Sequence, residues 1–155
     1  MNAKRIALLV TLGTCILGLS AFGSKKNPVE RPYKSVIHQT LVITLNSAGI
    51  PVSWELAGTA QCSHMGRSEN RATGIFDAGG NPVGTGVTTA ANGDQVFYYS
   101  PPGGGPSFIN GGTGRFEGAT GIIRAVSQEV VFRTDPPAGK LIADMVLVTE
   151  GTITY

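Results

Sequence analysis

NGGTGRFEGATG, at residues 110–121, is the stretch that decides the fold of this chain. A flexible linker has no reason to place one large aromatic residue and two opposite charges at fixed points among glycines. Glycine tolerates left-handed backbone conformations and close approach of other backbone. We therefore expect the segment to turn corners at the end of a β-barrel, with Phe116 as a hydrophobic plug. The corner positions are Gly112, Gly114, Gly118 and Gly121, and alanine is not expected to fit the backbone angles of Gly112 and Gly114.

Composition indicates a single all-β domain. The chain has 155 residues, of which 41% are hydrophobic and only 14% are charged, and it contains 22 glycines. A length in this range is typical of one domain. Few charges together with many Gly, Thr and Val residues favour strands over a helical bundle.

A positively charged start and an apolar run mark residues 1–23 as a signal peptide. Lys4 and Arg5 precede the apolar run, and a small-x-small pattern predicts cleavage after the last residue of this range. Two alternatives stay open: a transmembrane anchor, since the run is close to the minimum spanning length of about 17 residues, and a lipoprotein attached through Cys15. The preferred interpretation is an exported protein, periplasmic or secreted, with no stable membrane span after cleavage.

Charge is unevenly distributed along the chain. There are 12 Lys+Arg and 10 Asp+Glu in all; taking away the six basic residues and one glutamate before residue 35 leaves six basic against nine acidic. We expect residues 24–34 to be a basic flexible leader and residues 35–155 to be a mildly acidic barrel domain. Nucleic-acid-binding domains carry a basic surface, so the sequence argues against a nucleic-acid partner.

Turn-rich segments divide the domain into short runs. Clusters of Gly, Pro, Asn and Asp recur between them, and no stretch sustains a 3.6-residue period together with helix caps. The runs that we expect to be strands are 35–45, 52–62, 70–77, 83–89, 95–100, 121–133 and 141–155. A short eighth strand is expected around residues 114–118.

Alternation in residues 52–62 indicates a strand with two distinct faces. The even positions fall in size from Trp54 and Leu56 to Cys62, with Glu55 on the opposite face. Grading from large to small suits the tapering interior of a small barrel. About eight antiparallel strands close a barrel that is either filled by side chains or holds one small ligand.

Several short motifs together resemble one family. They are GTA at 58–60, SHMGR at 63–67, ANGD at 91–94, GGTGRFEGATG at 111–121 and EGTITY at 150–155. Over residues 35–155 the chain resembles the bacterial exported proteins grouped with the allene oxide cyclase barrel-like domains, which are related to plant allene oxide cyclases and dirigent proteins. The resemblance implies an eight-stranded antiparallel barrel. It also implies a homo-oligomer as a candidate, since the plant relatives are often oligomeric.

The resemblance suggests two kinds of function. Plant allene oxide cyclases isomerise an unsaturated fatty-acid epoxide with a cavity glutamate as the main polar group, and dirigent proteins orient phenolic radicals for coupling. Neither chemistry transfers residue by residue, because Glu55 is expected to face away from Trp54 and Leu56. We therefore expect non-catalytic binding of a small hydrophobic molecule or of a partner surface. A cyclase- or isomerase-like enzyme is the alternative.

Two interpretations of strand 121–133 stay open, because neither of its faces is purely apolar. If the even face points inward, Arg124 and Gln128 enter the barrel with Phe132, and a buried charge needs a partner or a ligand. If the odd face points inward, Glu129 enters instead. Either arrangement makes the interior partly polar. A cavity of about 300 Å³ or more would favour a ligand, whereas a barrel filled by its own side chains would exclude one.

Other polar residues have both a functional and a structural interpretation. His64 and Arg67 flank a glycine turn, where they either form a polar pair at the barrel mouth or bind loop carbonyls. Arg115 and Glu117 either bind an anionic group of a ligand or tie down the backbone and each other. Cys62, the lone cysteine after the signal peptide, is expected to fill the core. We favour the structural interpretation for each.

Motifs for a nucleophile, a metal or a phosphate are missing from the sequence. It has no G-x-S-x-G elbow and no HExxH pattern, and no pattern joins His38 to His64. The sequence therefore predicts no cofactor and no metal, and leaves catalytic residues unassigned. The candidate ligand-binding residues are Trp54, Leu56, Cys62, His64, Arg67, Arg124, Gln128 and Phe132.

Overall fold

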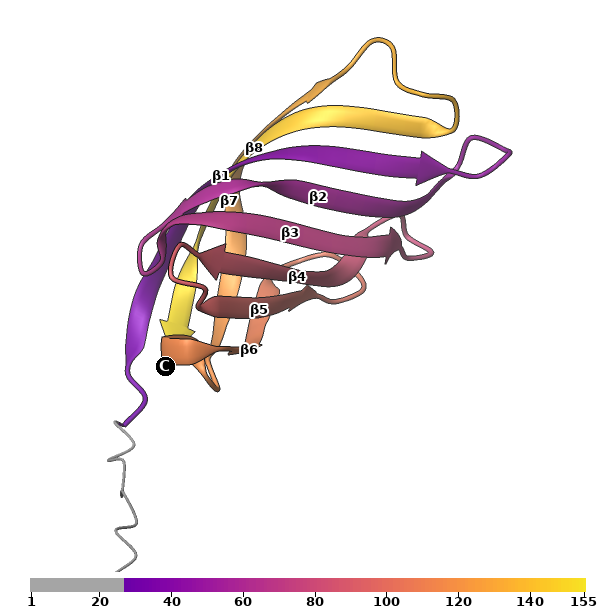
Figure 1. Ribbon diagram of the computed structural model, residues 1–155. Coiled ribbons are helices and arrows are strands. Elements are labelled where there is room, and N and C mark those ends of the chain that lie inside the picture. The colour runs from indigo at the N-terminus through magenta and orange to yellow at the C-terminus, as the bar shows by residue number, and fades with distance from the viewer. Residues whose placement is uncertain (1–26) are drawn as a thin grey trace, which may run out of the picture.

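The computed structural model, shown in Figure 1, describes residues 27–155 as one closed antiparallel barrel. Each strand pairs with its neighbour in sequence, and the last strand returns to the first. The strands are β1 (Glu30–Leu45), β2 (Pro51–Cys62), β3 (Gly66–Phe76), β4 (Pro82–Ala90), β5 (Gln95–Ser100), β6 (Ser107–Gly112), β7 (Thr120–Phe132) and β8 (Lys140–Thr154). The predicted fold class, an all-β barrel of eight antiparallel strands, is confirmed.

The first strand begins earlier than the sequence predicted. β1 starts at Glu30, which pairs with Thr154, so residues 30–34 belong to the barrel instead of to a flexible leader. They are ordered because β8 continues far enough to supply a paired backbone along their whole length. The predicted signal peptide, with Cys15 inside it, lies outside the described residues.

The eighth strand is β6, and the predicted strand around residues 114–118 is wrong. Gly114–Phe116 instead forms a 3₁₀ turn, η1, which is the only helical element in the described part of the chain. Gly114 has a φ of 61°, a left-handed conformation that a strand does not contain. The sequence did not predict β6 because proline precedes this short run and glycines end it, so that it resembled part of a turn.

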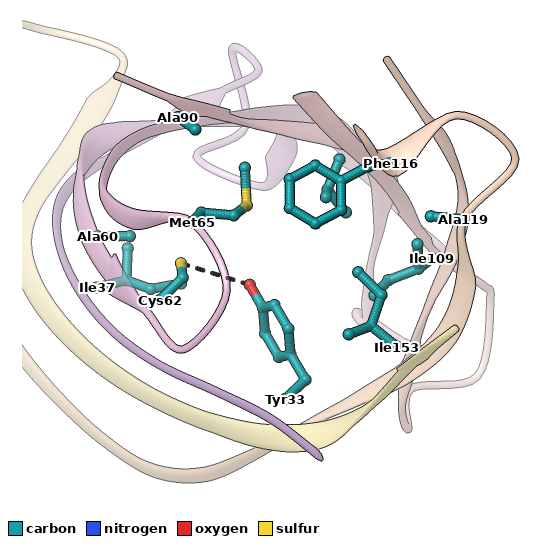
Figure 2. Packing of buried hydrophobic residues seen from close by; sticks show 11 residues of the cluster. Tyr33, Ile37, Ala60, Cys62, Met65, Ala90, Ile109, Phe116, Ala119 and Ile153 are labelled. Atoms are coloured by element: carbon teal, nitrogen blue, oxygen red, sulfur yellow. Dashed lines mark hydrogen bonds between the residues drawn. The ribbon is translucent and has the colours of Figure 1, made fainter. Parts of the chain in front are cut away.

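Alternating strand direction gives the barrel two different ends, seen at lower left and at right in Figure 1. The turns after β2, β4 and β6 lie at the closed end, together with the C-terminus. The hairpin turns after β1, β3, β5 and β7 lie at the open end. A hydrophobic cluster, here called the closed-end core, fills the closed end; it comprises Tyr33, Ile37, Ala60, Cys62, Met65, Ala90, Val96, Ile109, Phe116, Ala119 and Ile153 (Figure 2).

Phe116 is the plug that the sequence predicted. Its side chain is 0% exposed, and its ring meets that of Tyr155 edge-on with 4.8 Å between centroids. Figure 2 shows it projecting into the ring of strands beside the other members of the closed-end core. The guanidinium of Arg115 lies 4.8 Å from the centroid of the Phe116 ring. The glycine segment therefore closes one end of the barrel with a single aromatic side chain.

The glycines around Phe116 serve two different needs. Gly114 is left-handed, and a Cβ at this position would also collide with the carboxylate of Asp94. The reason predicted for Gly112 is wrong: it is not left-handed, but a Cβ there would clash with neighbouring backbone carbonyls. Gly118 is left-handed with open space around it, and Gly121 lies against the backbone of β8. Glycine is therefore needed in this segment for two reasons: a left-handed backbone angle at some positions and close contact with neighbouring backbone at others.

Candidate functional site

A cavity of about 560 Å³ occupies the barrel between the closed-end core and the open end. Where it reaches the open end, Phe132 is 54% exposed. Its apolar wall consists of Leu41, Ile43, Trp54, Leu56, Phe76, Val130, Phe132, Met145 and Leu147, with smaller contributions from other residues. None of the lining side chains identified in residues 27–155 is Asp, Glu, Lys, Arg or His. The barrel is hollow, and the large side chains of its inner face line the space instead of filling it.

Trp54 is held in the cavity wall by one hydrogen bond and two glycines. Its indole Nε1 donates to the carbonyl oxygen of Ile75 at 3.0 Å, and the side chain is only 6% exposed. Gly74 and Gly84 make room for the ring, since a Cβ at either position would come within 2.7 Å of a ring carbon. Leu56 lines the cavity on the same face of β2. The prediction that Trp54 and Leu56 point inward is confirmed.

A second, larger depression of about 840 Å³ lies on the outer surface of the barrel. Glu55, Arg71, Thr73 and Phe97 are among its lining residues. Glu55 thus faces outward, opposite Trp54, as predicted. This depression is open to solvent, so a small molecule would lose little of its water there. The interior cavity is the better candidate for a ligand site.

Four polar side chains, here called the polar layer, interrupt the apolar wall of the cavity: the buried Gln39, Asn70 and Thr88, and the half-buried Tyr98. Asn70 is the centre of the layer. Its Nδ2 donates to Gln39 Oε1 at 2.9 Å, and its Oδ1 accepts from Thr88 Oγ1 at 3.1 Å and from the Tyr98 hydroxyl at 2.9 Å. The layer joins four strands, β1, β3, β4 and β5. It lies between Leu41 towards the open end and Ile37 of the closed-end core, both of which also line the cavity.

Both phenols near the floor of the cavity are uncharged at neutral pH. Burial raises the pKa of Tyr98 to about 12, although its hydrogen bond to Asn70 acts in the opposite direction. Burial also raises the pKa of Tyr33 well above its ordinary value, and the neighbouring Cys62 adds to that effect. The polar groups presented to a ligand are therefore neutral hydroxyls and amides.

Sequence reasoning missed the polar layer. The available signal was Gln39, which interrupts the inward face of β1 between Ile37 and Leu41. Its partner Asn70 lies 31 residues away, and Tyr98 lies 28 residues beyond Asn70. No local pattern connects residues at these separations. Only the register of the paired strands β1 to β5 brings the four side chains together, with Gly58 of β2 between Gln39 and Asn70.

A β-bulge decides which side chains of β7 enter the cavity. The register of β7 against β8 shifts between Ala125 and Ser127, which leaves Val126 as the extra residue. One extra residue exchanges the two faces of a strand. Accordingly Ile123 lines the cavity before the bulge, and Gln128 lines it after the bulge. Each of the two predicted interpretations is therefore right for one half of the strand.

Because of the bulge, one predicted site residue of β7 lies outside the cavity and two lie in its lining. Arg124 lies opposite Glu150 on the outer surface and is exposed, so the expectation that it enters the barrel together with Gln128 is wrong. Gln128 and Phe132 both line the cavity near the open end. The interior is polar because of amides and hydroxyls, and not because of a buried arginine.

Three further predicted residues lie away from the cavity. Cys62 is 3% exposed within the closed-end core, where its Sγ accepts a hydrogen bond from the Tyr33 hydroxyl at 3.6 Å (Figure 2). Its predicted role as core filler is confirmed. His64 donates from Nε2 to the Pro32 carbonyl oxygen at 2.6 Å, and Arg67 is exposed on β3. The alternative of a His64–Arg67 pair at the cavity mouth is not what the structure shows, because both sit at the closed end.

Arg115 ties the glycine segment to its surroundings. Its Nη2 donates to the carbonyl oxygen of His64 at 2.6 Å, and its Nε lies 3.4 Å from Asp94 Oδ2. Together with its position over Phe116, these contacts support the structural interpretation of Arg115. Glu117 is exposed.

At the open end, Asp77 joins two turns at the rim of the barrel. Its Oδ1 accepts from the backbone N–H groups of Gly79 and Asn81, each at 2.9 Å, and its Oδ2 accepts from that of Gly103 at 2.8 Å. These bonds, the one from Gly103 foremost, hold the pKa of the carboxyl below its usual value. The glycine-rich β5–β6 connection is thereby fastened to the β3–β4 turn.

Comparison with known proteins adds no assignment. No protein-family model matches the chain, and no curated protein matches it either. Among residues 27–155, no group of three or more His, Cys, Asp or Glu side chains could hold a metal ion. No helix in the same range is long and apolar enough to cross a membrane. The resemblance to the allene oxide cyclase barrel-like proteins stays a prediction from the sequence motifs.

Proposed function

We propose that the chain is an exported barrel protein that binds a small hydrophobic molecule inside its cavity, without catalysis. The observation that carries the proposal is the cavity of about 560 Å³ with its mostly apolar wall. Small-molecule sites are typically apolar hollows of about 300–1,000 Å³ with a few polar groups that fix orientation. Export rests on the sequence pattern of residues 1–23 alone.

The lining of the cavity favours an uncharged, apolar ligand. Each Å² of apolar surface that a ligand and the wall remove from water is worth about 25 cal/mol. A charged ligand would lose its hydration without meeting an opposite charge, since the lining residues in the described chain carry none. Tyr98 is protonated near pH 7 as an ordinary phenol is, and burial raises its pKa further, to about 12, so it adds no charge.

A cyclase- or isomerase-like enzyme is the alternative function. Catalysis that folds a substrate by shape needs few chemical groups, and the same cavity would serve it. It has weaker support, because the wall offers neutral Tyr98 but no carboxylate or imidazole poised for proton transfer near pH 7.

Two neighbouring valines on β7 allow a matched test of ligand binding. Val130 lines the cavity, whereas Val131 is 58% exposed on the outer surface. We expect Val130→Trp to weaken binding of the neutral dye 1-aminoanthracene by about tenfold or more, a loss of at least about 1.4 kcal/mol, because the indole occupies the cavity. Val131→Trp should leave the affinity unchanged. Dye emission during titration with purified residues 24–155 measures both affinities.

The proposal fails if the wild-type protein does not bind the dye, or if the two variants bind it equally well. Native mass spectrometry of the protein purified from its producing cells gives an independent reading. A retained molecule of defined mass, lost in Val130→Trp and kept in Val131→Trp, is the supporting result.

A further inference from the structure

The polar layer contains one buried donor without a partner. Gln39 is 6% exposed, and its Oε1 accepts a hydrogen bond from Asn70. Its Nε2 has no hydrogen-bond partner, and among the described residues it is the only buried side-chain nitrogen or oxygen in that position. A buried N–H group that has lost water and gained no partner is destabilising, so such groups are rare in native proteins and call for a physical explanation.

The network around Asn70 sets the direction of the Gln39 amide. Thr88 and Tyr98 direct their hydroxyls to Asn70 Oδ1, so Asn70 Nδ2 is left to face Gln39. Gln39 accepts this hydrogen bond with Oε1, and its Nε2 is therefore the end that has no hydrogen-bond partner. In this arrangement the free end of the Gln39 amide is a donor, because its oxygen is already paired with Asn70.

This donor belongs to a residue of the cavity wall. Gln39 lines the cavity from the middle of β1, between the apolar side chains of Ile37 and Leu41 on the same face. The last torsion of a glutamine side chain is broad. Binding requires a turn about this torsion, because Nε2 itself is closed to solvent; the turn would direct Nε2 towards a bound molecule while Oε1 stays near Asn70.

We propose that Gln39 Nε2 binds a neutral acceptor, a carbonyl oxygen, on the hydrophobic ligand of the cavity. This inference rests on the proposed binding function and specifies its ligand class: an apolar body with one buried carbonyl at the polar layer. A pure hydrocarbon would leave the donor unpaired. A carboxylate would satisfy Gln39 but would bury its charge where no lining side chain in residues 27–155 is cationic.

Two probes of nearly equal shape isolate the carbonyl. Benzophenone and diphenylmethane differ only in a C=O group that replaces a CH₂ group, and isothermal titration calorimetry measures the affinity of each. For the wild-type protein we expect benzophenone to bind about tenfold more tightly, which is about 1.4 kcal/mol. Sites that bind a polar group through a buried partner reject the analogue that lacks it.

Two variants of the polar layer show whether Gln39 is the cause. Gln39→Leu removes the donor, so the affinity ratio of the two probes should fall to about one. Thr88→Val is the matched control: it removes another hydrogen bond to Asn70 in the same layer. Tyr98 still donates to Asn70 Oδ1 in this variant, so Asn70 Nδ2 keeps facing Gln39 and Gln39 Nε2 stays in place. The tenfold preference should survive in Thr88→Val. Loss of the preference in both variants would overturn the assignment to Gln39.

The wild-type protein supplies a readout that does not depend on folding of the variants. In ¹⁵N–¹H spectra, the side-chain amide of Gln39 should shift on addition of benzophenone and stay in place with diphenylmethane. Equal binding of both probes without that shift would overturn the carbonyl inference and leave the proposed binding function standing. No binding of either probe would overturn both.

Discussion

Replacing Phe116 by alanine tests whether one aromatic side chain closes the barrel. Phe116 is 0% exposed and lies in the closed-end core, with Tyr155 edge-on at 4.8 Å and the guanidinium of Arg115 over its ring. The backbone of η1 around it is fixed by turns of its own: the Phe116 N–H donates to the Thr113 carbonyl oxygen at 3.1 Å. The change Phe116→Ala therefore removes the ring but keeps the backbone hydrogen bond that forms the turn.

The expected loss of unfolding free energy follows from burial and from the void that remains. Fully burying a phenylalanine side chain contributes about 1.5–3 kcal/mol, and the lost edge-to-face contact with Tyr155 adds about 0.5–1.5 kcal/mol. Barrel strands that pair on both sides cannot collapse into the space, so a cavity cost is added. The total is expected at about 3–5 kcal/mol, the range typical of Phe→Ala in packed cores.

Urea denaturation followed by fluorescence measures this loss, because the chain has a single tryptophan, Trp54, which is buried in the cavity wall. Phe132→Ala is the control: the same substitution is made at the rim of the open end, where the side chain is 54% exposed. It should cost less than about 1.5 kcal/mol, since only part of the ring is removed from water. Equal losses in Phe116→Ala and Phe132→Ala, or a Phe116→Ala protein as stable as the wild type, would refute the reasoning.

Two other changes test the turns at the two ends of the barrel. Gly114→Ala should destabilise the protein by more than Gly118→Ala in urea denaturation. Both glycines are left-handed, a strain of about 1–2 kcal/mol for alanine, but only a Cβ at 114 also displaces the Asp94 carboxylate from its contacts with Asn92 and Arg115. Equal losses would contradict this added cost. The pKa of Asp77 is lower in the folded state than in the unfolded chain, first because of the hydrogen bond from Gly103. The ionised carboxylate therefore stabilises the folded state above the unfolded pKa of about 3.9, and this contribution is lost as the pH falls through the folded pKa. Asp77→Asn should therefore lower the Tm at pH 7, and the deficit relative to the wild type should shrink as the pH drops below about 3.9; a deficit that is constant with pH would show that ionisation of Asp77 is irrelevant.

Local patterns in the sequence were enough to predict the barrel and its plug. Period-two alternation along β2 depends only on successive residues pointing to opposite faces, so it correctly placed Trp54 and Leu56 inside and Glu55 outside. The glycine segment likewise identified Phe116, because a lone aromatic residue among turn glycines has few positions other than the core. These features are set by the backbone within a few residues, and the sequence carries them directly.

The tertiary structure alone decided what the inside of the barrel presents to a ligand. The bulge at Val126 reverses the faces of β7; in the sequence this appears only as two faces of mixed polarity, which do not show where the extra residue lies. The polar layer depends on hydrogen bonds between strands, such as Asn70 to Gln39 across 31 residues. Whether the interior was filled or hollow was settled by the closure and taper of all eight strands. Hydrogen bonds and packing between residues distant in the sequence make the site, whereas the alternation that predicts a strand lies within a few consecutive residues.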